Sequence, residues 1–219
     1  MGRSQKGWQT VRRIFDMENP FWQGLSVVAD MMALNLLTLL CCVPIFTLGT
    51  AFTAMNDVVI HILRQEESGI LKSYGRAFRQ NMKKGIIFGL IVLAAVGLLC
   101  FDYLCAMAYA PVFRYGITAL AVLLLVLSIY TFALLARYEN GLGKTLKNAA
   151  MLAVGYFPRT LGMVCFIVAF WLLCIRFYRV GAPVLFMFGF SLPCYVCITL
   201  MRPIFDRLEP ENRKETDSI

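Results

Sequence analysis

Charged residues are scarce in this sequence, and it holds a single histidine, His61. Only 16% of its 219 residues are charged, whereas 59% are hydrophobic. Ordinary soluble domains carry about 25% charged residues. A soluble fold of this size has too small an interior to bury so much apolar side chain, so lipid must cover much of it. The scarcity of charge therefore excludes an ordinary soluble protein and indicates an integral membrane protein.

Motifs for catalysis and cofactor binding are also missing from the sequence. It has no phosphate-binding loop, no Ser/His/Asp set and no pair of catalytic carboxylates, and one histidine leaves little room for general-base catalysis. Cys194 and Cys197 have the spacing of a redox or zinc pair, but no second pair and no histidine lies near them in the sequence. We therefore expect no enzyme activity, no cofactor and no metal site.

The apolar residues are gathered into runs of the length that a membrane helix needs, about 20 residues. Five runs qualify clearly, at residues 25–44, 85–110, 116–136, 160–175 and 181–201. A sixth, 46–63, is weaker because it carries Asn56, Asp57 and His61, so it is either a full span or the returning half of a hairpin that starts at Pro44. The sequence predicts an all-α polytopic membrane helix bundle of about six spans, with one membrane domain over residues 1–219.

The lysines and arginines indicate the orientation of this domain. Of the 21 lysines and arginines, four lie in the N-terminal tail, six in 64–84, four in 137–159 and four in 202–219. The two remaining connections hold only one and two. The richer connections are expected on the cytoplasmic side. Both termini then lie in the cytoplasm, with residues 1–24 as an interfacial segment rather than a signal peptide and 203–219 as a short, polar, frayed tail. Because these charges flank apolar spans, nucleic acid is not an expected partner.

Two of the basic connections have helical periodicity. In 71–85 an apolar stripe opposes the basic residues Lys72, Arg76, Arg79 and Lys83. In 141–157 a similar stripe, from Leu142 to Ala153, runs beside Lys144 and Lys147. We predict two amphipathic helices on the inner membrane surface, whose basic side chains face either lipid phosphates or a docked partner protein.

A few polar residues interrupt the apolar runs. Ionisable groups at membrane depth are costly and often functional, so Asp30, Asp57, His61 and Asp102 are candidates for a proton or cation pathway. The plainer interpretation is that each is a buried hydrogen-bond partner between helices or reaches the interface. The eight cysteines are expected as small packing residues, although five of them fall toward the outer half, where one disulfide could form.

The most specific local pattern is Pro44-Ile-Phe-Thr47-Leu-Gly49-Thr-Ala51-Phe-Thr-Ala54. It combines a helix break with small residues that allow close backbone approach. With Leu34-Asn35 before it and Phe78-Arg79-Gln80-Asn81 after it, this pattern resembles the YesL family of bacterial membrane proteins over nearly the whole chain, from about residue 19 to 208. The resemblance implies a multi-pass protein of the cell membrane, typically in a Gram-positive bacterium and encoded beside carbohydrate ABC importers.

Two functions remain open at this point. The resemblance favours a non-enzymatic accessory protein that associates with the permease subunits of an oligosaccharide ABC importer, with the basic inner helices as its docking surface. The alternative, based on the four intramembrane polar residues, is a small-solute or proton-coupled transporter or channel in its own right.

Overall fold

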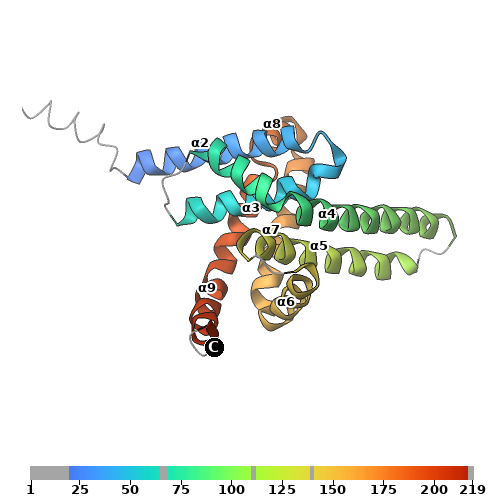
Figure 1. Ribbon diagram of the computed structural model, residues 1–219. Helices are drawn as coiled ribbons and strands as arrows, with labels where there is room; N and C mark the ends of the chain where they lie inside the picture. Colours follow the sequence, from blue (N-terminus) through green and yellow to red (C-terminus); the bar gives the residue numbers. More distant parts are fainter. Residues whose placement is uncertain (1–19, 65–68, 110–111, 139–140, 217–219) are drawn as a thin grey trace, which may run out of the picture.

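The computed structural model describes residues 20–64, 69–109, 112–138 and 141–216, and every element in these ranges is a helix (Figure 1). In chain order the elements are α2 (Pro20–Cys41), η1 (Ile45–Thr47), α3 (Leu48–Leu63), α4 (Ile70–Tyr109), α5 (Phe113–Arg137), α6 (Leu142–Gly155), α7 (Phe157–Arg176), α8 (Tyr178–Phe188) and α9 (Ser191–Thr216). The predicted all-α class is confirmed. The expected N-terminal segment lies outside the described residues, apart from the start of α2.

The number of spans is also as expected. Within the described residues, five helices are long and apolar enough to cross a membrane, and α8 with α9 adds a sixth if the bent pair counts as one span. Many large apolar side chains on α4, α5 and α7 are exposed, among them Leu98, Leu120 and Leu172, as lipid-facing residues must be. The fold is that of a polytopic membrane helix bundle.

The helix α3, the weakest span in the sequence, lies at the centre of the molecule. Within an 18-residue window of the candidate span Ile45–Leu63, 61% of the residues are buried, against at most 39% in the other four unbroken candidate spans of the described chain. Pro44 and the short η1 turn the chain back from α2, and the Thr47 hydroxyl donates to the carbonyl oxygens of Cys41 and Pro44 at 2.6 and 2.7 Å. The contact with Cys41 gives a partner to a carbonyl that the end of α2 leaves open. α2 and α3 therefore form a helical hairpin.

Glycines bring α3 and α4 into backbone contact. A Cβ atom added to Gly49 would lie 2.5 Å from the Gly89 Cα and would also clash with the Gly85 carbonyl oxygen. A Cβ on Gly85 would in turn lie 2.7 Å from the Thr50 Cα. The Gly85-x-x-x-Gly89 spacing thus works as a close helix-packing motif. It fixes the hairpin against the middle of α4.

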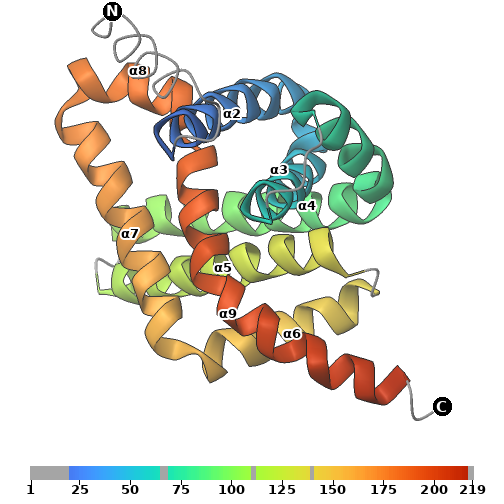
Figure 2. The same ribbon diagram turned by 90° about the vertical axis from the view of Figure 1, so that its left-hand side faces the viewer.

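The structure differs from the sequence expectation at the start of α4. We expected a separate surface helix at 71–85 followed by a span at 85–110, but α4 is one helix of 40 residues, and Figure 2 shows it turning between its two halves. Gly85 does not end the helix, because its missing side chain serves the contact with α3. Part of the apolar face of the first half packs on protein: Tyr74 and Ala77 are buried, and the Tyr74 hydroxyl donates to the Ala51 carbonyl oxygen at 3.3 Å. Leu71 and Met82 of the same half are exposed.

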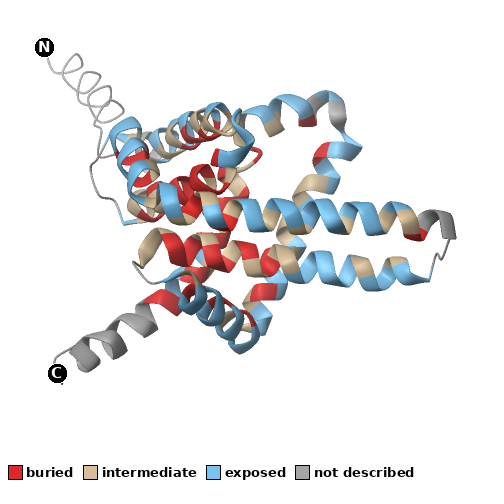
Figure 3. Ribbon diagram, turned by 45° about the vertical axis from the view of Figure 1, so that its right-hand side comes forward, coloured by how far each residue is buried: buried red, intermediate tan, exposed pale blue. Residues whose placement is uncertain are grey.

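The remaining long helices run in two directions that cross each other. The second half of α4 pairs with α5 and extends beyond the bundle, with mostly exposed residues at its far end (Figure 3). Both ribbon views show α7 crossing this pair steeply. α6 is a separate helix, close to the predicted 141–157. α9 continues to Thr216, so most of the expected polar tail is helical rather than frayed.

Candidate functional site

The bundle contains a broken helix at the junction of α8 and α9. The segments Gly181–Phe188 and Ser191–Phe205 meet at an angle of 59°. In a continuous helix the Phe190 N–H would donate to the Phe186 carbonyl oxygen, four residues earlier. At the break, both groups instead bond to a side chain of another helix. Within lipid, such groups need a protein partner, because no water is present to replace the bond.

The partner at this break is Asn35, a fully buried residue of α2. Its Nδ2 donates to the Phe186 carbonyl oxygen at 2.8 Å, and its Oδ1 accepts from the backbone N–H groups of Phe190 and Ser191 at 2.9 and 3.2 Å. One side-chain amide thus ends α8 and caps α9. The bend is therefore held by α2, more than 150 residues away in the chain.

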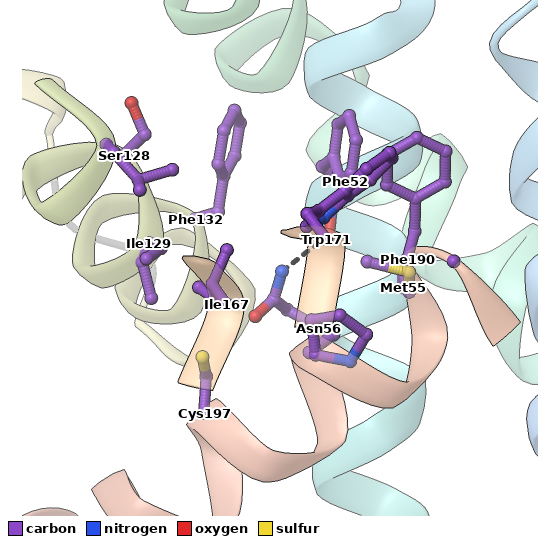
Figure 4. Close-up of a pocket in the computed structure, with 14 residues that line it drawn as sticks. Phe52, Met55, Asn56, Ser128, Ile129, Phe132, Ile167, Trp171, Phe190 and Cys197 are labelled. Carbon is purple, nitrogen blue, oxygen red and sulfur yellow. Dashed lines mark hydrogen bonds between the residues drawn. The ribbon is translucent and has the colours of Figure 1, made fainter. Parts of the chain in front are cut away.

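A cavity of about 260 Å³ lies beside the break, between α3, α5, α7 and α9. Four aromatic rings line it: Phe52, Phe132, Trp171 and Phe190. Phe52 lies against Phe132 and Phe190 with ring centroids 5.9 and 5.3 Å apart, and Trp171 lies 6.0 Å from Phe190. Phe190 connects the two features, since Asn35 holds its backbone and its ring lines the cavity (Figure 4).

Polar side chains in this cavity are few. Asn56 is 8% exposed, and its Nδ2 donates to the Phe52 carbonyl oxygen at 2.8 Å. Figure 4 shows its amide oxygen turned into the cavity, toward Ile167 and Cys197. The Ser128 hydroxyl donates to the Leu124 carbonyl oxygen of its own helix. Among the described residues that line the cavity there is no Asp, Glu, Lys, Arg or His.

The basic residues predicted at 71–85 form one exposed row. Lys72, Arg76, Arg79 and Lys83 are all exposed, at positions that share one face of a helix. The first half of α4, residues 70–85, which we call the arm, packs into the core on another face through Ser73, Tyr74 and Ala77. We call these four residues the α4 basic row. The arm is therefore held in place while its charges remain accessible.

Lys144 and Lys147 of α6 are also exposed. This helix is fixed through Thr145, Ala149 and Ala153, which are buried at four-residue spacing. Leu146 and Ala150, expected on the apolar stripe, are exposed, so the packed side is rotated from the one predicted. At the end of α6, the Tyr130 hydroxyl and the Thr160 hydroxyl lie 2.9 Å apart, and Thr160 donates to the Ala153 carbonyl oxygen at 3.0 Å.

Of the four candidate intramembrane polar residues, the structure brings two together. The His61 Nε2 lies 3.6 Å from the Asp57 Oδ2, one turn apart on α3. Asp30 is half-buried on α2 and Asp102 is exposed on α4. Neither is joined to the Asp57–His61 pair by an ion pair or hydrogen bond between described residues. The four do not form a continuous chain of bonded groups.

The cysteines form neither disulfides nor a metal site among the described residues. All eight cysteines are free thiols in this structure, and Cys194 and Cys197 lie buried beside the cavity. In the described part of the chain, no group of three or more His, Cys, Asp or Glu side chains is arranged to hold a metal ion.

Sequence reasoning missed the two asparagines that matter most here. Asn35 is a lone amide in an apolar run and Asn56 interrupts a weak span; buried amides of this kind are expected to be hydrogen-bonded across helices. A polar amide in an apolar run shows that the residue needs a partner, but it does not show which residue the partner is. The partners of Asn35 lie on the far side of the sequence, and the cavity draws its walls from four separate helices.

Part of the chain matches a known protein family. Residues 31–103 fit the model of a family described as protein of unknown function, DUF624. The matched region runs from the second half of α2 through the hairpin to Tyr103 in the C-terminal part of α4, and includes Asn35, the glycine contact and the α4 basic row. Searches of curated proteins and of solved structures gave no match.

Proposed function

We propose that this chain is a non-enzymatic accessory protein of the cell membrane that associates with a carbohydrate ABC importer. The observation that carries the proposal is the α4 basic row, which is exposed on an arm that Tyr74 and the glycine contact hold against the core. A rigid docking surface favours binding, because its backbone loses little conformational entropy when the partner binds. Only the lysine and arginine side chains then have to become ordered.

The family resemblance supports the choice of a sugar importer as the proposed partner. The YesL-like pattern around Pro44 and Gly49 falls inside the matched region 31–103. We take from it the association with an oligosaccharide importer in a Gram-positive bacterium, and from the positive-inside rule the cytoplasmic location of the α4 basic row, of Lys144 and Lys147, and of both termini.

The chemistry of the cavity supports an accessory role over a role as the sugar pathway. A sugar presents many hydroxyl groups, each of which must exchange its water for a protein partner. The cavity lining offers the amide of Asn56 and the hydroxyl of Ser128 amid mostly apolar groups. The importer's own permease subunits would then carry the oligosaccharide.

Affinity purification tests this proposal. A tagged copy is purified from its native membrane in mild detergent, and the co-purifying subunits are identified by mass spectrometry. Permease subunits of a sugar importer should be recovered in stoichiometric amounts. If other membrane complexes survive the same conditions and no importer subunit is recovered, the proposal is wrong.

A second candidate function is a transporter in its own right, and the broken α8–α9 helix favours it. Discontinuous helices that build the substrate site are typical of secondary transporters. Flux measurements in proteoliposomes distinguish this candidate. Transport by the purified chain alone, reduced by Asp57→Asn or His61→Ala, would favour it over the accessory role.

A further inference from the structure

The cavity beside the helix break has the features of a binding site rather than a packing defect. Its volume of about 260 Å³ exceeds the roughly 150 Å³ of a cavity that holds benzene and approaches the lower end of drug-sized pockets, about 300 Å³. A molecule of one or two rings would fill it. Four aromatic side chains in mutual contact line it, which suits a flat apolar ligand.

One polar atom in the cavity, the side-chain oxygen of Asn56, can accept a hydrogen bond from a ligand. Asn56 is more than nine-tenths buried, and its one hydrogen bond within the described part of the chain is the donation from Nδ2 to Phe52. Its Oδ1 faces the cavity (Figure 4). An acceptor that lines an apolar cavity gains from a hydrogen-bond partner, so a ligand that supplies one O–H or N–H is favoured by the contact.

The lining also excludes other classes of ligand. A carboxylate, phosphate or ammonium group would be desolvated with no opposite charge among the lining residues. An oligosaccharide would leave most of its hydroxyl groups unpaired. What remains is an uncharged, mainly apolar molecule with a single donor.

We propose that this cavity binds a neutral aromatic compound of one or two rings that carries one hydroxyl group, with the rings of Phe52, Phe132, Trp171 and Phe190 around its apolar body and the Asn56 Oδ1 accepting from its hydroxyl. This site is independent of the proposed importer association. Because Phe190 lies at the junction that Asn35 holds, an occupied cavity supports the bend between α8 and α9.

Fluorescence of Trp171 tests the proposal directly. Replacing Trp8 and Trp22 with phenylalanine leaves Trp171 as the single tryptophan of the chain. The variant is placed in lipid nanodiscs and titrated with three bromine-bearing probes, since bromine quenches tryptophan on contact. The probes are 4-bromophenol, bromobenzene and 4-bromobenzoate.

The expected result is saturable quenching by 4-bromophenol, about tenfold weaker binding of bromobenzene, and no saturable quenching by 4-bromobenzoate. The tenfold step corresponds to one hydrogen bond. Asn56→Leu should weaken 4-bromophenol by about tenfold and leave bromobenzene unchanged. Ser128→Leu, which fills the cavity, should abolish saturation for both.

Other results would overturn the proposal. Equal binding of 4-bromophenol and bromobenzene in the parent variant would show that Asn56 accepts no bond from the ligand, whether or not Asn56→Leu folds. Quenching that rises linearly for all three probes would reflect partition into the bilayer alone. If lipids with brominated acyl chains quench Trp171 and added phenol does not relieve the quenching, a lipid chain occupies the cavity instead.

Discussion

The side-chain amide of Asn35 bonds to the backbone N–H of Phe190 at 2.9 Å and so replaces a hydrogen bond that a continuous helix would make within itself. The same amide donates to the Phe186 carbonyl oxygen, the former acceptor of that bond. The bend at the cavity is therefore a property of two distant segments rather than of the local sequence alone.

Removal of this amide should destabilise the protein strongly. Asn35→Leu leaves the Phe186 carbonyl and the Phe190 N–H without partners inside an apolar bundle, which we expect to lower the free energy of unfolding by about 2–4 kcal/mol. Unfolding in mild detergent, followed by circular dichroism, measures the change. Asn81→Leu is the matched control, because the Asn81 amide bonds to Ala77 of its own helix, and it should cost less than about 1 kcal/mol.

The close contact of Gly49 with Gly85 and Gly89 can be tested by adding a methyl group at Gly49. Gly49→Ala places a methyl group against the backbone of Gly85 and Gly89, so α3 and α4 must separate. We expect a loss of about 1–3 kcal/mol. Gly97→Ala, on the same α4, meets no atom within 4 Å and should be neutral or stabilising by up to about 1 kcal/mol. Equal stabilities for the two variants would show that the helices do not approach this closely.

The hydroxyl pair that joins α5 to α7 should behave as a coupled unit. Tyr130→Phe and Thr160→Val each break the 2.9 Å contact, so the double variant should lose about 0.5–1 kcal/mol less than the sum of the single variants. Tyr130→Phe with Thr118→Val is the control pair, because the Thr118 hydroxyl bonds only to Arg114 of its own helix. Additive losses in both pairs would contradict the bond.

The orientation of the chain can be measured with reporter insertions. We expect alkaline phosphatase inserted at residue 112 to be active, since this connection should lie outside, and the same enzyme inserted at residue 140 or fused after residue 219 to be inactive. A fluorescent protein at the last two positions should be bright. Phosphatase activity at residue 140 would refute the six-span orientation.

The sequence predicted the helical segments well where periodicity or length was informative. The expected span 46–63 became Ile45–Leu63, and the exposed faces of Lys72 and Lys144 followed from helical spacing. Gly85 misled the prediction, because a glycine that follows two lysines looks like a boundary, whereas in the fold it is a contact point within α4. Local composition cannot distinguish these two roles.

The candidate site was far less predictable. Asn35 and Phe190 are 155 residues apart, and neither carries a local signal for the other. The cavity likewise depends on how α5, α7 and α9 pack around α3. The expected orientation comes from charge bias, and the proposed partner comes from the family resemblance.

The central claim is that the α4 basic row docks the protein onto an importer, and charge reversal tests it most directly. Lys72→Glu with Arg76→Glu reverses two exposed charges of the row; Arg176→Glu with Arg179→Glu reverses two exposed charges near the junction of α7 and α8, on the expected opposite side. Both variants carry the same net charge, so their recovery of importer subunits is directly comparable. We predict at least a tenfold loss of recovery for the first variant, as expected from about 1.4 kcal/mol of lost binding, and unchanged recovery for the second. Equal recovery by both variants would contradict the claim.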